Sequence, residues 1–407
     1  MPRKQLKAAK RRKRMRIQIF SGAALALLLI VALPLALHGM KNRGLTPPLP
    51  SPGPAVTEAE ATETAEATIV PAVEPTATPK PTVPPEPTAT PVPDAVSITI
   101  SAAGDCTLGG DMLGPSEARF AKFIKDSGDP NGYCFKNVKS IFEQDDLTIV
   151  NLEVVLTDSG KYNPNNDPSK IFIMRGKPSY AKMLPANSIE IANISNNHIN
   201  DFGDAGVDET IQHLTENGVD YFGYGHTLVK EVKGVRVGFA GFNTWTTKDS
   251  AIEGAIKDLR KQCDVLIVSF HWGSELKYVA TDKQIAYAHK AVDLGADLVL
   301  GHHPHVVNGI EVYKGVNIVY SLGNFVFGGK ADPKDKDTFI YQHTFTVQGG
   351  KIVGNEPKVI PCKITSVKDE SSNNYQPIPV TGAKAEAILK KIESYSKQFN
   401  EALKLGR

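Results

Sequence analysis

The sequence predicts an α/β domain, because apolar strand-like runs alternate with helical patterns between residues 96 and 365. The runs are rich in β-branched residues and are almost continuously apolar, which is typical of strands covered on both faces. A stretch of about 270 residues is also long enough to bury a substantial core. The predicted strands lie at residues 96–104, 147–154, 189–195, 235–242, 264–272, 296–303 and 316–323.

Helical patterns and a hairpin fill parts of the intervals. Residues 204–218 and 281–295 show apolar spacing near 3.6, and Thr281 stands where an N-cap is expected. Alternating residues on both sides of the Gly-Gly pair at 349–350 predict an antiparallel hairpin. The charged stretch 383–405 predicts a C-terminal helix.

The N-terminal segment predicts a membrane anchor. Residues 1–16 form a basic tail, and residues 17–37 form a 21-residue apolar run. Such a run makes a helix of about 31 Å, close to the thickness of a hydrocarbon core. The basic residues on the N-terminal side of the run predict that the N-terminus stays in the cytoplasm. A single-pass cell-membrane anchor would then place the rest of the chain outside the cell. The alternative is a long cleaved signal.

A linker and a folded region are expected after the anchor. Residues 38–95 are rich in Pro, Thr, Ala and Glu, a composition that favours extended segments without a core. The folded domain is expected at residues 96–365, followed by an extension at 366–407. This organisation predicts a globular domain held away from the membrane.

The charge balance argues against nucleic acid as a partner. The chain carries a net charge of +2, but the first 43 residues hold eleven Lys and Arg and no acid. The remainder has 35 bases against 44 acids, a net charge of −9, and no basic stripe with interleaved aromatic residues. The four cysteines have irregular spacing without a C-x-x-C pair, so a disulfide stays open and a cysteine zinc site is disfavoured.

Polar residues follow five of the predicted strands. Because ligands bind at the carboxyl ends of strands in α/β sheets, these residues are expected to meet. Oxygen and imidazole donors without thiolate suit Mn, Fe, Zn or Mg, and two such ions can share a carboxylate. His198 is expected to be the general acid. The candidate metal ligands are Asp105, Glu153, Asn197, His271, His302, His303 and His305.

Each candidate also has an ordinary structural interpretation. Asp105 and Asn197 could be turn or cap residues, Glu153 an edge charge and His271 a satisfied buried ring. Asn324 is interpreted as a turn residue rather than a ligand. The ordered set of five strand ends favours the metal-site interpretation.

The ordered motifs G-D, N-L-E, N-N-H, F-H-W-G and G-H-H-P-H-V, followed by Y-S-L-G-N-F, resemble the bacterial CapA-type family of capsule-synthesis proteins. That family is associated with poly-gamma-glutamate and resembles the calcineurin-like metallophosphoesterases. The resemblance implies a four-layer α/β/β/α sandwich with two divalent metal ions. It matches Glu153 to the bridging acid, Asn197 and His198 to the N-H pair, and His303 with His305 to an H-x-H pair.

The motifs depart from the phosphoesterase pattern in three places. Thr107 replaces a histidine, Glu153 replaces an aspartate, and Ile199 with Asn200 replaces the acid that orients His198. Asp201 could substitute for that acid. These changes put ordinary phosphoesterase activity in doubt.

Two functional classes compete, and a third ranks below them. The first is an anchored extracellular hydrolase or transferase acting in synthesis, export or anchoring of an anionic cell-surface polymer, together with capsule-synthesis complex subunits. The second is a non-catalytic polymer-binding component, and the third an extracellular metal-dependent phosphodiesterase. Lys170, Arg175 and Lys177 could supply cations for a polyanion, or simply form a solvated loop.

The G-H-H-P-H-V turn leaves one local question. Pro304 is expected to bias His303 toward an extended backbone. His302 is either a third ligand in place of the histidine missing at Thr107 or a ring that orients the others.

Overall fold

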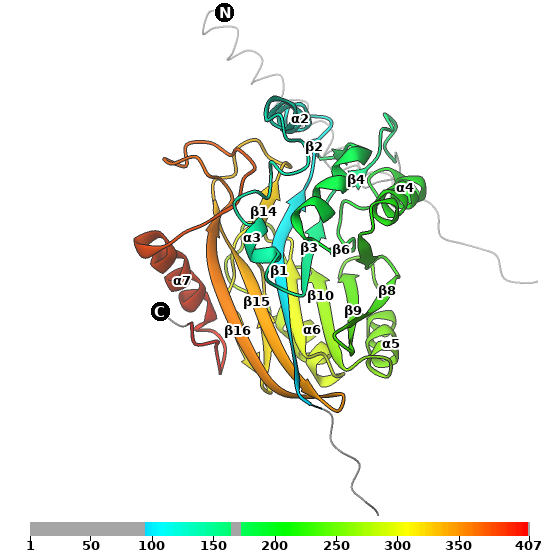
Figure 1. Cartoon of the computed structure of the whole chain (residues 1–407), viewed down its shortest axis with the longest axis vertical. Helices are drawn as coiled ribbons and strands as arrows, with labels where there is room; N and C mark the ends of the chain where they lie inside the picture. The colour runs from blue at the N-terminus through cyan, green and yellow to red at the C-terminus, as the bar shows by residue number, and fades with distance from the viewer. Residues whose placement is uncertain (1–93, 164–171, 406–407) are drawn as a thin grey trace, which may run out of the picture. The chain divides into compact units, whose positions relative to one another are not determined.

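The computed structural model describes residues 94–163 and 172–405 (Figure 1). The predicted basic tail, the anchor at 17–37 and nearly all of the linker lie outside these residues. Within the described ranges, no helix combines the length and the apolar character needed to cross a bilayer.

The first sheet has eight strands and carries the long β1 strand at its centre. Its order is β17-β16-β15-β1-β3-β6-β7, and β14 pairs with the end of β1. Parallel pairs join β1, β3, β6 and β7, whereas β15 and β16 are antiparallel. The bounds are β1 Val96–Thr107, β3 Leu147–Leu152, β6 Ile191–Asn193, β7 Asp220–Phe222, β14 Asn324–Phe327, β15 Asp337–Gln348, β16 Lys351–Lys363 and β17 Ile378–Pro379.

A second sheet has six strands in the order β12-β13-β11-β10-β9-β8. Its strands β9, β10, β11 and β13 are parallel. The bounds are β8 Thr227–Val232, β9 Val235–Asn243, β10 Val265–His271, β11 Leu298–His302, β12 Ile310–Tyr313 and β13 Val316–Val319. A small third sheet contains β2 Gly110–Asp111, β5 Met174–Gly176 and β4 Val155–Leu156.

The two large sheets pack face to face. Ile100 and Leu147 of the first sheet share a buried apolar cluster with Val237 and Ile267 of the second. Because alternate residues of a strand point to opposite faces, each sheet also presents an outer apolar face. The outer face of the first sheet is covered by α2, α3 and α4, and that of the second by α5 and α6. The layers therefore follow the order α/β/β/α, and the mixed α/β class is confirmed.

The helices follow the apolar spacing of the sequence. Thr281 caps α6 through a capping box with Gln284, as its position predicts. The helix bounds are α2 Ser116–Asp126, α3 Lys139–Phe142, α4 Gly203–Glu216, α5 Asp249–Arg260, α6 Asp282–Asp293 and α7 Gly382–Ser396, with short 3-10 helices η1 Pro178–Met183 and η2 Pro185–Asn187.

The C-terminal helix is shorter than predicted. The helix was expected to continue to residue 405, but α7 ends at Ser396. Its Ile388 and Ile392 are buried against the inter-sheet core. Beyond it the chain runs alongside β12, where Val312 N–H donates to the Glu401 carbonyl at 2.9 Å. These backbone bonds to a strand replace the helical ones that would have continued α7.

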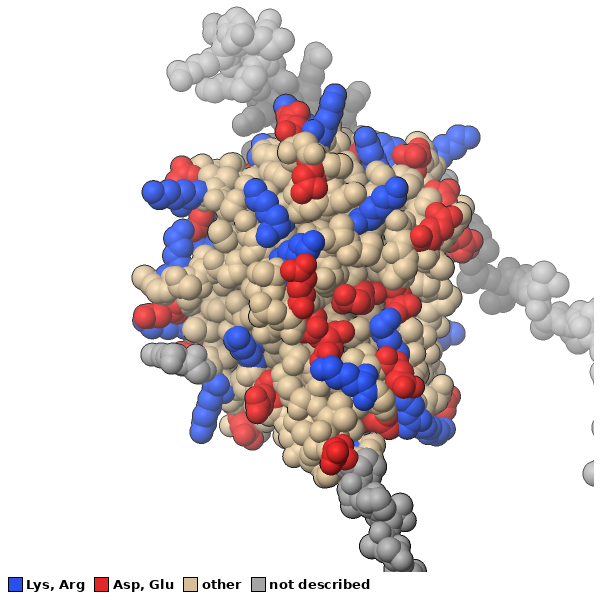
Figure 2. Space-filling view, viewed as in Figure 1, with Lys and Arg blue, Asp and Glu red and all other residues tan. Residues whose placement is uncertain are grey.

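All four cysteines, Cys106, Cys134, Cys263 and Cys362, are free and buried. The question of a disulfide is thereby answered for the described residues. Basic and acidic side chains are interspersed over the face seen in Figure 2, and no continuous basic expanse crosses that face.

Candidate metal centre

Strand ends from both sheets meet at one site. Glu153 follows the last residue of β3, His271 ends β10, and His302 ends β11. Asp105 was expected just past the first strand, but it lies within β1. The reason is β14, which pairs with β1 at Asp105 and Thr107 and so prolongs the strand.

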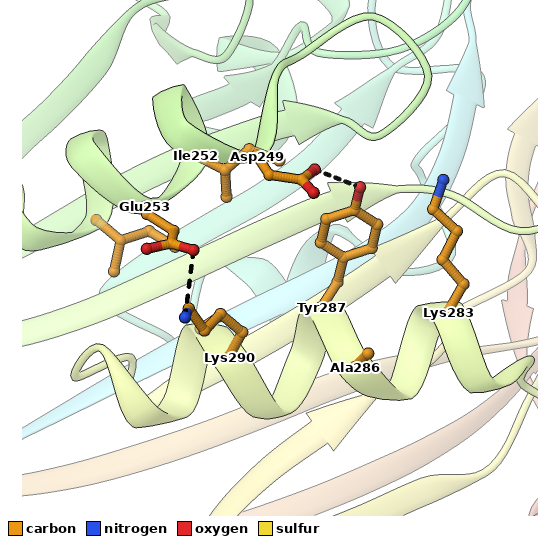
Figure 3. A pocket seen from close by; sticks show the side chains of 9 residues that line it. Asp249, Ile252, Glu253, Lys283, Ala286, Tyr287 and Lys290 are labelled. Atoms are coloured by element: carbon orange, nitrogen blue, oxygen red, sulfur yellow. Dashed lines mark hydrogen bonds and ion pairs between the residues drawn. The ribbon is translucent and has the colours of Figure 1, made fainter.

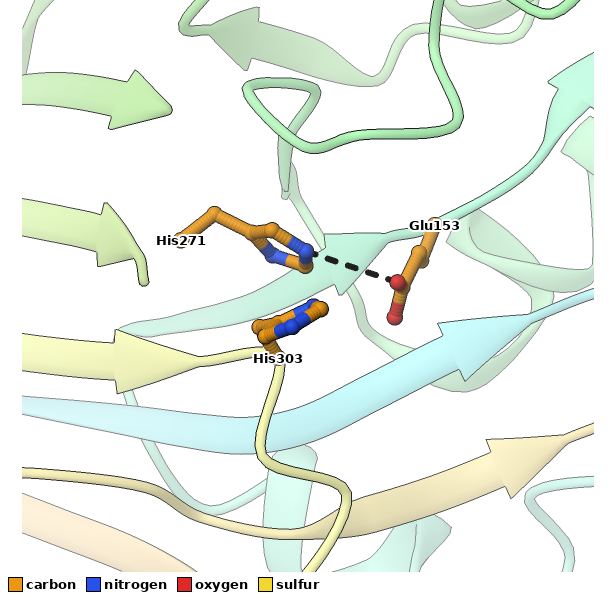
Figure 4. A group of neighbouring side chains, drawn as sticks. All are labelled: Glu153, His271 and His303. Atoms are coloured by element: carbon orange, nitrogen blue, oxygen red, sulfur yellow. Dashed lines mark ion pairs between the residues drawn. The ribbon is translucent and has the colours of Figure 1, made fainter. Parts of the chain in front are cut away.

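Glu153 belongs to two groups of residues that could each hold a metal ion. One group contains Glu153, His271 and His303 (Figure 4), and the other contains Glu153, Asp105 and His305. Within each group the ligand atoms all lie within 4.8 Å of one another. A carboxylate shared by two such groups is the arrangement that a pair of divalent ions requires.

Several buried polar atoms of these groups have no hydrogen-bond partner. They include both carboxylate oxygens of Glu153 and the Nδ1 atom of His303. Buried polar atoms are normally hydrogen-bonded, so a group of unpaired donors and acceptors requires an explanation. Carboxylate and imidazole atoms left in this state fit divalent cations.

Asp105 is the most heavily contacted acid of the site. Asn151 Nδ2 donates to its Oδ1 at 2.8 Å, and the His303 backbone N–H donates to its Oδ2 at 3.3 Å. His305 Nδ1 lies 3.0 Å from the same Oδ2. Although burial opposes its charge, the His302 and His305 side chains hold the pKa of Asp105 well below its usual value. Asp105 is therefore an anion in this setting.

The imidazoles of the site differ in charge. Burial lowers the pKa of His271 well below its usual value and that of His303 to about 2, so both rings are neutral and able to ligate. Burial opposes the charge on His305, yet Glu153 and Asp105 raise its pKa to about 9. Burial also raises the pKa of Glu153 to about 7. In the absence of cations, His305 supplies positive charge between the two acids.

Asn197 and His302 take different positions around this centre. Asn197 Oδ1 lies 2.9 Å from His271 Nε2, so it contacts one of the ligand rings. His302 is in neither metal-holding group, and its Nδ1 lies 3.3 Å from Asp105 Oδ1. His302 therefore contacts Asp105 and lies outside both metal-holding groups.

The backbone of the G-H-H-P-H-V turn contradicts the expected extended conformation of His303. His303 has φ of 94° and His305 has φ of 57°, both in the left-handed region. The bias that Pro304 imposes is outweighed by local hydrogen bonds. The His303 N–H reaches Asp105, and the Pro304 carbonyl accepts from Leu276 N–H at 2.9 Å. Strain of this kind is typical of functional sites.

His198 lies beside the centre with an acid of its own. His198 Nδ1 is 2.8 Å from Asp201 Oδ2, and the same oxygen accepts from Met174 N–H at 2.7 Å. Asn196 Oδ1 accepts from the His198 backbone N–H at 3.0 Å. Asp201 therefore occupies the orienting position that the sequence left open.

Comparison with known proteins identifies the family. Residues 99–329, more than half of the chain, match the family described as "Bacterial capsule synthesis protein PGA_cap". The chain belongs to this family. The resemblance to CapA-type proteins is thereby confirmed.

Two curated relatives of this PGA_cap chain carry related names. It is 30% identical over 276 residues to "Capsule biosynthesis protein CapA" of Bacillus anthracis, covering 59% of this chain and 65% of that protein. It is 32% identical over 216 residues to "PGA biosynthesis protein CapA" of Bacillus subtilis (strain 168), covering 47% and 56%. The chain thus spans less than two thirds of the length of either relative.

A solved structure, a hypothetical protein from Thermus thermophilus, aligns with 65% of this chain and 99% of its own. Its identity is 17% and its TM-score 0.39, which is too low to carry an argument.

Two further residues contact the PGA_cap site, although the predicted ligand set contains neither. Asn151 donates a hydrogen bond to Asp105. The ring of Trp245 contacts that of His303 edge to face, with ring centroids 4.6 Å apart. Trp245 lies two residues after β9, but the strand-end rule considered polar donors only, so it did not select this ring. Asn151 lies in the N-L-E motif, but nothing in the sequence indicates that its amide faces Asp105.

A cavity of about 300 Å³ opens beside Glu153, His198 and His305. Another pocket, between α5 and α6, is lined by Asp249, Glu253 and Tyr287 among others (Figure 3). There Tyr287 Oη donates to Asp249 and Lys290 pairs with Glu253. Three residues of the candidate centre, Glu153, His198 and His305, thus border the first cavity, and none of them lines the second.

The three basic residues considered above as binding groups for a polyanion lie in different environments. Arg175 pairs with Glu117 at 2.9 Å and donates to the Ser159 carbonyl, so it serves the loop packing. Lys177 is exposed, and Lys170 lies outside the described residues.

Proposed function

We propose that this chain acts in the synthesis, export or anchoring of an anionic capsule polymer such as poly-gamma-glutamate, through a two-metal site of hydrolase or transferase type. The observation that carries the proposal is the buried Glu153 carboxylate, which is shared by two metal-holding groups and has no hydrogen-bond partner at either oxygen. The family adds the setting, since its description is that of bacterial capsule synthesis.

The names of the relatives support the polymer assignment. One is a capsule and the other a PGA biosynthesis protein. The order of layers and the N-N-H and H-x-H motifs support a metallophosphoesterase-like origin of the site. In this chain Asp201 orients His198 from three residues away, and Thr107 stands where that pattern has a histidine.

The residues of such a site would have different roles. Asp105, Glu153, His271, His303 and His305 would hold two divalent ions of the Mn, Fe, Zn or Mg class, with Asn197 beside His271. Divalent ions in these positions supply Lewis-acid chemistry for hydrolysis or group transfer. His198, oriented by Asp201, would donate a proton to the leaving group from its Nε2 atom.

The proposal extends to location and partners. The apolar run at 17–37 and the basic residues before it support a single-pass anchor, with the folded domain outside the cell membrane. The partners would be the anionic polymer, the membrane and subunits of a capsule-synthesis complex. Nucleic acid is not among them, given the net charge of the exported part.

The decisive experiment combines metal analysis with capsule production. The full chain is purified in detergent, and its metal content is measured for the wild type, Glu153→Gln and His271→Ala. Glu356→Gln, an exposed acid on β16, is the matched control. We expect about two equivalents in the wild type and control, a loss in the two site variants, and no polymer production in a capsule-deficient strain complemented with either.

Other outcomes select other functions. Site variants that still support polymer production would favour the non-catalytic binding component, as would a metal-free wild type. Rapid turnover of simple phosphodiesters with manganese would favour the extracellular phosphodiesterase.

A further inference from the structure

One buried residue connects the two strands that bring imidazoles to the metal centre. Trp272 directly follows His271, and its backbone N–H donates to the His302 carbonyl at 3.2 Å. This bond joins the end of β10, which carries His271, to the end of β11, which leads to His303. The indole is 1% exposed and stacks on Phe270 with ring centroids 4.8 Å apart. The packing around Trp272 therefore helps to set the position of the His271 backbone.

Tyr320 holds the indole of Trp272. Its backbone carbonyl accepts from Trp272 Nε1 at 3.0 Å, and the two rings stack with centroids 5.7 Å apart. Tyr320 is fully buried, and its Oη donates to Glu311 Oε2 at 2.6 Å. The hydroxyl end of Tyr320 is therefore fixed, and the position of its ring depends on the groups that pack against its faces.

Phe399, from the C-terminal segment, packs on the ring of Tyr320. The two ring centroids are 4.8 Å apart, and the rings are within 14° of parallel. Since Tyr320 contacts both Phe399 and Trp272, three stacked rings connect the C-terminal segment to the residue after His271. Close-packed side chains transmit a displacement to their neighbours, because an interior has few voids to absorb it.

The C-terminal segment is fixed to the second sheet on both sides of Phe399. Ser396 Oγ accepts from Ile310 N–H at 2.9 Å, and the Ile310 carbonyl accepts from Leu403 N–H at 3.2 Å. The segment lies outside residues 99–329, which match the family. Phe399 is therefore not among the residues that the family match assigns.

We propose that Phe399 is a positioning residue of the metal centre, which acts through Tyr320 and Trp272 to hold His271 where it can bind a divalent ion. The proposal rests on the proposed function, because the role of His271 as a ligand comes from that function. It goes further by giving the C-terminal extension a part in the site.

The first measurement requires no metal. In a Trp245→Phe background, Trp272 is the single tryptophan, so the near-ultraviolet circular dichroism of its indole reports the packing around it. Adding Phe399→Ala should remove much of this signal, whereas adding Leu403→Ala should leave it unchanged. Leu403 is the matched control, because it is a partly buried apolar residue of the same segment that packs against the inter-sheet core instead.

The second measurement is Co²⁺ binding to the full chain in detergent, followed by the visible absorption of the bound ion. Phe399→Ala should raise the dissociation constant about tenfold, the lower end of the effect of removing groups that orient metal ligands, and should change the absorption spectrum. Phe399→Tyr keeps the stacked ring and should bind Co²⁺ like the wild type. Leu403→Ala should also bind like the wild type, although both alanine variants lower the thermal midpoint.

An unchanged Trp272 signal in Phe399→Ala would overturn the proposal, and so would an unchanged dissociation constant for Co²⁺. Equal weakening by Leu403→Ala would also overturn it, because Phe399 would then contribute only general stability. A wild type that binds no Co²⁺, while Phe399→Ala still loses the Trp272 signal, would be a failure of the two-metal function. Equal Co²⁺ binding by wild type and Phe399→Ala would instead be a failure of the positioning role, so the two failures are distinguishable.

Discussion

His198 Nδ1 lies 2.8 Å from Asp201 Oδ2, and the same oxygen accepts the backbone N–H of Met174. Asp201 is fully buried and is held from two sides, so the orientation of the His198 ring is fixed by β5 as well as by its own loop. The free Nε2 atom of His198 is the one that can serve the substrate.

This pair predicts a graded loss of turnover. His198→Ala should lower the rate of polymer processing by about 10²- to 10⁴-fold, the usual contribution of a general acid. Asp201→Asn should lower it by about 10- to 100-fold, because the ring is still present but less well oriented. The measurement is the change of polymer chain length with time, with metal content as a control. Equal rates for wild type and His198→Ala would remove His198 from the mechanism.

The shared carboxylate predicts a metal-dependent gain in stability. Manganese at a hundredfold excess over its dissociation constant should stabilise the wild type by about 2.7 kcal/mol for each ion bound, seen as a rise of the thermal midpoint. Glu153→Gln should lose most of that rise, since both metal-holding groups contain Glu153. Glu356→Gln, the exposed control, should respond like the wild type. An unchanged rise in Glu153→Gln would place the metal elsewhere.

Trp245 predicts an optical signal for metal binding. The chain has two tryptophans, and the ring of Trp245 lies 4.6 Å from that of His303. The other, Trp272, is buried and stacks on Phe270. Adding Co²⁺ should therefore quench part of the tryptophan emission, and Trp245→Phe should lose most of the effect. Quenching that persists in Trp245→Phe would show that the ion binds away from His303.

Asp337 predicts an acid-dependent loss of stability. Burial opposes its charge, but Lys363 and Lys391 hold its pKa below the ordinary value of 3.8. An acid with a lowered folded-state pKa contributes stability above its unfolded pKa and loses it as the pH falls through the folded one. The contribution of Asp337 is therefore fully present at neutral pH and declines as the pH falls below about 3.8 toward the lowered folded-state pKa.

The variant Asp337→Asn should lower the free energy of unfolding at pH 7 by about 2 kcal/mol, less than a fully buried pair because Lys391 is partly exposed. Urea unfolding at pH 7 and pH 3 measures it, and the difference from wild type should shrink at pH 3. Asp258→Asn, which removes a pair exposed on both sides, is the control. A difference that is as large at pH 3 would contradict this electrostatic role.

Much of the site could be predicted because strand ends are visible in a sequence. Glu153, His271 and His303 follow runs whose apolar character marks them as buried strands, and parallel strands bring such ends together. The contacts between these side chains could not be predicted. The sequence does not reveal that Asn151 faces Asp105, because those residues pair across two strands 46 positions apart.

The local backbone was the least predictable part. Pro304 favours an extended residue before it, and only the hydrogen bonds from the His303 N–H and to the Pro304 carbonyl override that preference. Similarly, α7 ends at Ser396 because the following residues run along β12, a contact between distant parts of the chain. In both cases tertiary partners outweigh a correct local tendency.

The position of β1 has a consequence for the order of synthesis. Its first half pairs with β15, and Thr99 meets Thr344 across 245 residues of chain. Strand β1 is made first among the folded elements, yet its antiparallel neighbour is made almost last. A nascent chain that stops before β15 leaves one edge of β1 open, which is an aggregation hazard. The strand that carries Asp105 is complete only when nearly the whole chain has been released.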